Sequence, residues 1–82
     1  QEIKIDKITL KPDFIINGIP IDAKYKFSIE NSDIYQAFTY GSVISKNLSI
    51  LIYPYLEYEI NIQDVKIKAI SIFKNLDNFF IL

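Results

Sequence analysis

Cysteine, histidine and methionine are all absent from this chain of 82 residues. Without cysteine or histidine, the chain has no disulfide, zinc finger or iron–sulfur cluster, and it cannot use histidine in catalysis. A metal ion would have to be held by oxygen ligands, which favours a hard cation such as Mg²⁺ or Mn²⁺. Catalysis would have to depend on carboxylate, lysine, tyrosine or hydroxyl groups.

Long apolar runs and an excess of positive charge are also absent. The longest apolar runs, such as residues 51–55, are far too short to span a bilayer, and no secretory leader opens the chain, so we expect a cytoplasmic protein without a membrane partner. The net charge of −1 means that any contact with nucleic acid must be local. The length allows one small domain, residues 1–82, and half of its residues are hydrophobic, which suffices for a core.

Alternating apolar residues predict a hairpin near the start of the chain. Residues 3–16 are typical of a strand that is interrupted near Asp6–Lys7 and again near Pro12. Asn17-Gly18 follows, which is the strongest short signal for a tight hairpin turn. Residues 19–27 then alternate as the returning strand, with Asp22, Lys24 and Lys26 on one face.

The remaining pattern predicts one helix and three more strands. Asn31, Ser32 or Asp33 is expected to cap a helix that ends near residues 46–47. Residues 48–53 form an apolar run closed by proline, as in a buried central strand, and residues 57–62 and 65–73 alternate again. The order β-β-α-β-β-β predicts an α/β fold, with a mixed sheet that carries a helix. Residues 75–82 are either a short helix or an apolar tail, and Phe79–Leu82 suggest docking onto this core or onto a partner.

The hairpin places its charges in an unusual way. If Asn17 and Gly18 form the whole loop, Asp13 lies directly opposite Asp22, and like charges at opposed positions destabilise a sheet. Lys24 projects from the same face as Asp22. An oxygen-bound cation would convert the repulsion into a ligand pair. The simpler alternative is that these charges form the solvated face of an amphipathic hairpin.

Three motifs in order resemble a known family. Pro12-Asp13 followed by Asp22-Ala23-Lys24 is similar to the PD-(D/E)XK nuclease signature, and Gln36-Ala37-Phe38-Thr39-Tyr40 resembles the Q-x-x-x-Y motif of its RecB-like branch. The string DIYQAFTY at residues 33–40, with LIYP at residues 51–54, is most similar to the McrC family, the nuclease subunit of modification-dependent restriction systems. The resemblance covers about residues 11–54.

The resemblance implies a metal-dependent DNA endonuclease with a restriction-endonuclease-like core. Asp13, Asp22 and the main-chain carbonyl of Ala23 would hold Mg²⁺ or Mn²⁺, and Lys24 would orient the attacking water or stabilise the developing charge. Gln36 and Tyr40, one helical turn apart, would support the catalytic face or contact DNA. An AAA+ NTPase of the McrB type is the implied partner, beside DNA. Lys26 and Lys46 are further candidates for phosphate contacts, or else ordinary surface residues.

The chain also departs from the family pattern. The family core begins with a helix that carries an acidic residue, whereas this chain opens on a strand at Gln1, so we interpret it as an incomplete core, with the first helix upstream, or as a degenerate piece. Two other functions stay open, namely a non-catalytic nuclease-like scaffold or interaction domain and a small protein of unrelated fold. The sequence leaves the oligomeric state and the DNA specificity undetermined.

Overall fold

The computed structural model describes residues 2–74, which form one helix, a π-helical turn and several strands. The elements in chain order are β1 (Ile3–Ile5), β2 (Ile8–Leu10), β3 (Phe14–Ile16), β4 (Ile19–Ala23), α1 (Asn31–Tyr40), the π-helical turn η1 (Gly41–Ser45), β5 (Leu48–Tyr53), β6 (Tyr58–Ile62) and β7 (Val65–Ser71). The expected strands and helix are therefore present, and the apolar segment Phe79–Leu82 lies outside the described residues.

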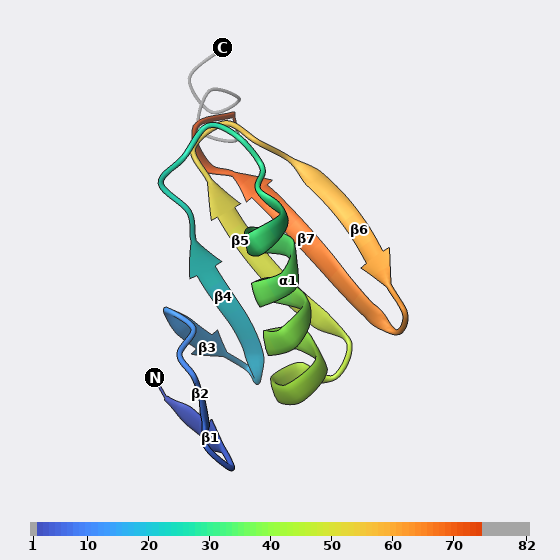
Figure 1. The fold of residues 1–82 in the computed structure, drawn as a ribbon. Coiled ribbons are helices and arrows are strands. Elements are labelled where there is room, and N and C mark those ends of the chain that lie inside the picture. Colours follow the sequence, from blue (N-terminus) through green and yellow to red (C-terminus); the bar gives the residue numbers. More distant parts are fainter. Residues whose placement is uncertain (1, 75–82) are drawn as a thin grey trace.

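The first strand region is interrupted where the sequence predicts. Asp6 has a left-handed backbone (φ 56°) and turns the chain between β1 and β2, which pair antiparallel with Ile3 opposite Leu10. Pro12 separates β2 from β3. The β1–β2 hairpin forms a two-stranded sheet of its own and projects away from the main sheet (Figure 1).

The main sheet is mixed, with the strand order β3-β4-β5-β7-β6. The neighbours β4, β5 and β7 run parallel, while β3 and β6 pair antiparallel at the two edges. Residues 48–53 form the central strand β5, as their continuous apolar run predicts, because a central parallel strand is flanked by other chain segments on both sides. The predicted class, α/β with a mixed sheet and a helix, is confirmed, and the arrangement is consistent with a restriction-endonuclease-like core.

The tight turn between β3 and β4 has the predicted geometry. Asn17 and Gly18 both have positive φ, 53° and 76°, as a type I′ turn requires. Ile16 pairs with Ile19, and the register continues outward to Phe14 opposite Ile21. The next positions along the two chains are 13 and 22, so the expected opposition of the two aspartates follows from the turn.

The returning strand is shorter than the alternation suggests. We expected it to reach residue 27, but β4 ends at Ala23, and Tyr25 is 92% exposed in the loop that follows. Ala23 pairs with Ile52 of β5, so Tyr25 would have to pair with Pro54. Proline has no amide hydrogen to donate, and β5 has ended by that point, so the ladder stops.

Helix α1 begins one residue earlier than the predicted caps allow. The residue that caps it is Glu30, not Asn31, Ser32 or Asp33. Asp33 instead sits in the first turn, where its Oδ2 accepts a hydrogen bond from the Glu30 N–H at 3.4 Å. The helical segment ends where expected, because Lys46 takes a left-handed conformation (φ 71°) after the turn η1. No helix among residues 2–74 is long and apolar enough to cross a membrane.

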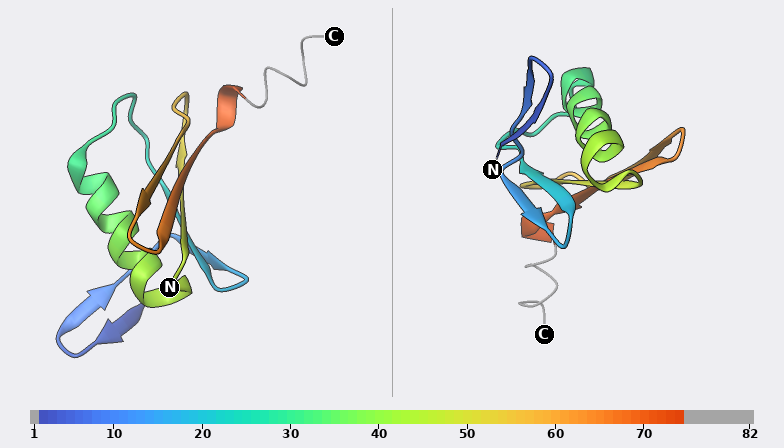
Figure 2. Two further views of the ribbon diagram at one scale, coloured as in Figure 1. Left: turned by 90° about the vertical axis from the view of Figure 1, so that its right-hand side faces the viewer. Right: turned by 90° about the horizontal axis from the view of Figure 1, so that it is seen from below.

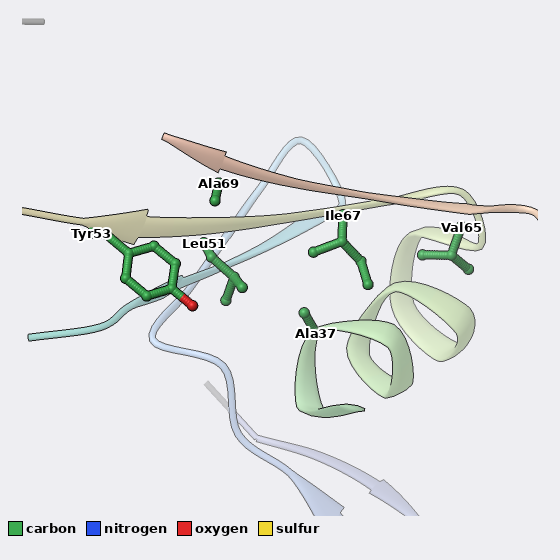
Figure 3. Packing of buried hydrophobic residues seen from close by; sticks show 6 residues of the cluster. All are labelled: Ala37, Leu51, Tyr53, Val65, Ile67 and Ala69. Atoms are coloured by element: carbon green, nitrogen blue, oxygen red, sulfur yellow. The ribbon is translucent and has the colours of Figure 1, made fainter. Parts of the chain in front are cut away.

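The core lies between α1 and one face of the sheet (Figure 2). The buried cluster consists of Ala37, Leu51, Tyr53, Val65, Ile67 and Ala69 (Figure 3). Alternate residues of β5 and β7 point into it, as the period of two requires. Gly41 lets the turn η1 lie close to Val65 of β7, since an added Cβ would lie 2.6 Å from Cγ1 of Val65. Helix α1 also contacts β4.

Candidate active site

The two hairpin aspartates are held side by side by the main chain. The Asp13 N–H donates to Oδ1 of Asp22 at 3.1 Å, and the Ala23 N–H donates to Oδ2 of Asp13 at 2.8 Å. Each carboxylate thus accepts a hydrogen bond from the opposite segment of the hairpin. These bonds give both carboxylates a main-chain partner and offset part of the repulsion between the two like charges.

The charged face of the hairpin is covered rather than solvated at Asp22 and Lys24, whereas Asp13 is exposed. Asp22 is 8% exposed, and Pro20 on the same face is fully buried, whereas Ile19 and Ile21 on the other face are only half-buried. The side chain of Lys24 is 14% exposed. The interpretation of Asp22 and Lys24 as an ordinary solvated face is therefore wrong, because helix α1 covers this side of β4.

Lys24 connects the hairpin to the helix. Its Nζ lies 2.9 Å from Oδ2 of Asp22 and donates a hydrogen bond to Oε1 of Gln36 on α1. Oδ1 of Asp33 lies 4.0 Å away. The ammonium group is thus confined between an acid of β4 and an amide of α1, so the structure brings Gln36 into the same cluster as Asp22 and Lys24.

Tyr40 belongs to the same cluster. It is 7% exposed, and burial raises the pKa of its hydroxyl, with a further increase from the nearby charge of Asp22. A backbone hydrogen bond from Lys11 and the charge of Lys24 lower the pKa of Tyr40, whereas the charge of Asp13 raises it. The phenol therefore stays neutral and lies within electrostatic reach of both aspartates.

Asp33 is a member of this cluster that the sequence reasoning treated only as a helix cap. Its side chain is 3% exposed, and its Oδ1 lies 3.0 Å from Nζ of Lys26. Its Oδ2 accepts a hydrogen bond from the hydroxyl of Tyr53 at 3.1 Å. A signal for its position was present, since Asp33 precedes Gln36 by three residues, the spacing that places two side chains on one side of a helix.

The environment of Asp33 keeps it ionised. Burial alone would raise the pKa of its carboxyl, but hydrogen bonds from Lys26, Tyr53 and the Glu30 backbone outweigh this and hold the pKa below its usual value. The Tyr53 hydroxyl lies 2.8 Å from the Tyr58 hydroxyl. Because the single Tyr53 proton points to the carboxylate, Tyr58 must donate to Tyr53.

The two lysines proposed as phosphate contacts differ in their surroundings. Lys26 is engaged by Asp33 and, at 3.5 Å, by Glu30, and the hydrogen bond to Asp33 is the main reason why the pKa of Lys26 is raised. Lys46 is exposed at the end of the helical segment. The structure therefore assigns Lys26 a carboxylate partner within the fold.

The donor set around Asp13 and Asp22 is compatible with a magnesium ion. Among residues 2–74, no three or more carboxylate, histidine or cysteine side chains converge as a metal-binding group. Magnesium does not require such a group, since it usually binds through one or two carboxylates and otherwise through water and substrate phosphates. The Asp13–Asp22 pair, whose oxygens are already oriented by amides and by Lys24, has the supporting hydrogen bonds that metal-binding carboxylates have.

Comparison with known proteins identifies the family. The family model described as "McrBC 5-methylcytosine restriction system component" matches residues 1–54, more than half of the chain. The chain belongs to this family and is thus related to a component of a restriction system. The matched region includes the β3–β4 hairpin, α1 and β5, which together carry the cluster. No curated protein and no solved structure matches the chain.

Proposed function

We propose that this chain is the nuclease core of a restriction system and hydrolyses DNA phosphodiester bonds with the help of a divalent cation. The finer assignment is a PD-(D/E)XK nuclease of the RecB-like branch, similar to McrC. The main support is one observation, namely that Asp22 is joined both to Asp13, whose N–H donates to its Oδ1 at 3.1 Å, and to Lys24, whose ammonium lies 2.9 Å from its Oδ2. Two carboxylates and one ammonium leave a net negative charge there, which suits a divalent cation.

Asp13 and Asp22 would hold Mg²⁺ or Mn²⁺, with the main-chain carbonyl of Ala23 as a further ligand. When bound, the cation would polarise the scissile phosphate and lower the pKa of a water molecule. The chain itself would position these ligands. The turn at Asn17-Gly18 sets the two acids side by side, and hydrogen bonds from backbone amides across the hairpin orient their oxygens.

Lys24 would face the scissile phosphate and stabilise the negative charge that develops on it, or orient the attacking water. A compact ammonium with three donors suits this task, and two of its donors are already directed to Asp22 and Gln36. Gln36 would support the site by holding Lys24, and Tyr40 by closing the side of the acid pair without adding charge.

DNA is the proposed substrate, and an AAA+ NTPase of the McrB type is the proposed partner. Family membership supports the association with a restriction system. Within this proposal, the mixed sheet and α1 are part of a nuclease core domain.

The first experiment is calorimetric titration of the chain with Mg²⁺ and with Mn²⁺. Binding is expected in the wild type and should be lost in Asp22→Ala. Glu59→Gln is the matched control, because Glu59 is a half-exposed acid on β6 whose ion-pair partner is Lys66 at 3.7 Å. If Asp22→Ala binds the cation as well as the wild type does, the proposed metal site is wrong.

The second experiment is plasmid nicking in the presence of Mn²⁺. Lys24→Ala should abolish nicking, whereas Lys66→Ala, which removes an exposed lysine of β7, should not change it. The assay should be repeated with the intact restriction complex, because the partner would deliver the DNA. Nicking by Lys24→Ala at the wild-type rate would contradict the proposal.

A non-catalytic scaffold is the competing function, and one observation favours it. No buried side-chain nitrogen or oxygen among the described residues lacks a hydrogen-bond partner, so the cluster is satisfied without a cation. A scaffold should bind no divalent cation at millimolar concentration. The calorimetric titration therefore separates the two functions.

A further inference from the structure

Asp33 is a buried charged group to which the proposed chemistry assigns no task. Its partners come from two separate parts of the chain: Lys24 and Lys26 in the loop between β4 and α1, and Tyr53 at the end of β5. A carboxylate that only capped the helix would need none of these contacts. The position of Asp33 therefore calls for a second explanation.

The carboxylate oxygen Oδ1 of Asp33 lies near two ammonium groups. It is 3.0 Å from Nζ of Lys26 and 4.0 Å from Nζ of Lys24. Without an anion between them, these two ammonium groups would repel each other. At 4.0 Å the contact with Lys24 is too long for a hydrogen bond, so Asp33 acts on Lys24 through charge.

Asp33 also lies one helical turn before Gln36, the residue that accepts a hydrogen bond from Lys24. Its bonds to Lys26 and to Tyr53 attach the first turn of α1 to the loop and to β5. Tyr58 in turn donates to Tyr53. The carboxylate is thus held from two sides, and its distance from Lys24 is set by strands and helix together.

We propose that Asp33 is a positioning residue, which keeps the Lys24 ammonium between Asp22 and Gln36 by charge attraction and by anchoring the helical turn that carries Gln36. The assignment of a catalytic task to Lys24 rests on the proposed nuclease function, but the positioning itself does not. Asp33 touches neither DNA nor cation in this scheme. It acts only through Lys24 and Gln36.

The test is the ¹⁵N-resolved spectrum of the lysine ammonium groups, with the Lys24 signal assigned by its loss in Lys24→Arg. In the wild type, the Lys24 ammonium should exchange its hydrogens slowly, because it is nearly buried and bonded to two partners. Asp33→Asn keeps the shape of the side chain and removes its charge. It should speed up this exchange about fivefold.

Two variants provide the controls. Glu30→Gln removes one negative charge from the same end of α1, but Glu30 contacts Lys26 and not Lys24, so the Lys24 signal should be unchanged. Tyr53→Phe removes a hydrogen bond to Asp33 and keeps its charge, so it tests a purely structural effect. It should lower stability and speed up the exchange of Lys24 less than Asp33→Asn does, because the charge of Asp33 remains.

An unchanged Lys24 signal in Asp33→Asn would overturn the proposal, as would an equal effect of Glu30→Gln. If Asp33→Asn does not fold, Asp33→Glu takes its place, because the longer side chain keeps the charge but displaces it and should also shift the Lys24 signal. In nicking assays Asp33→Asn should lower kcat about tenfold with KM nearly unchanged. If the wild type does not nick DNA even in the intact restriction complex, the nuclease function fails, while the spectrum still decides the positioning.

Discussion

The ammonium nitrogen of Lys24 lies 2.9 Å from Oδ2 of Asp22, and both side chains are almost completely shielded from water. The two residues are separated by one position, so they project from the same face of the chain. That face is covered by α1, whose Gln36 accepts another hydrogen bond from Lys24. A buried ion pair of this kind is expected to couple strongly, since the removal of one partner leaves the other charge uncompensated.

A double-mutant cycle measures this coupling. Lys24→Met should lower the free energy of unfolding by about 2 kcal/mol at pH 7, because Asp22 would lose its counterion while it stays buried. The double variant Asp22→Asn with Lys24→Met should lose less than the sum of the two single variants, as measured by urea denaturation. Strict additivity would show that the two charges do not interact. The exposed pair Glu59 and Lys66 provides the control cycle, with a coupling of less than about 1 kcal/mol.

The stability of the protein should fall in acid partly because of Asp33. The pKa of this carboxyl is lower in the folded protein than in the unfolded chain, so its ionised form stabilises the fold. This contribution is fully present above the unfolded pKa of about 3.9 and is lost as the pH falls through the lower pKa of the folded state. Asp33→Asn should therefore be less stable than the wild type at pH 7, and the difference should shrink below about pH 4.

Urea denaturation at a series of pH values from 7 down to 2.5 measures this difference. Glu30→Gln serves as the reference, because Glu30 is a mostly exposed acid at the same helix end. A difference between Asp33→Asn and the wild type that stays constant over this range would contradict the assignment of the effect to the ionised carboxylate.

The turn between β3 and β4 should be sensitive to the residue at position 18. Gly18 has φ 76° and no atom near its missing side chain, so Gly18→Ala should cost about 1 kcal/mol through backbone strain alone. Gly18→Asn should cost less, because asparagine tolerates a left-handed backbone. Both values come from thermal or urea unfolding. Equal costs for alanine and asparagine would contradict this explanation.

Much of the hairpin was predictable because its rules are local. The conformational preference of Asn17-Gly18 sets a two-residue turn, and the turn sets the register that puts position 13 opposite position 22. The apolar run of residues 48–53 likewise identified the central strand β5, since parallel strands inside a sheet are apolar at nearly every position.

Other features depend on neighbours that the local pattern does not reveal. The length of β4 was overestimated because the strand can continue only while β5 offers backbone hydrogen-bond partners. Pro54, which has no amide hydrogen, follows the end of β5. Asp33 was interpreted as a cap because short polar residues are common at that position of a helix. Its contacts with Lys26 and Tyr53 come from segments that the chain brings together only on folding.

The sequence by itself determined the chemistry that is available and the alignment of the hairpin. The absence of cysteine and histidine restricts the site to carboxylates, lysine, tyrosine and amide groups, and the turn aligns Asp13 with Asp22 through short-range backbone preferences. Only the tertiary structure decided which face of the hairpin is buried. The packing of α1 onto the side that carries Asp22 and Lys24 shields these charges from water, so each of them needs a partner, and Gln36 and Asp33 are the partners that the helix supplies.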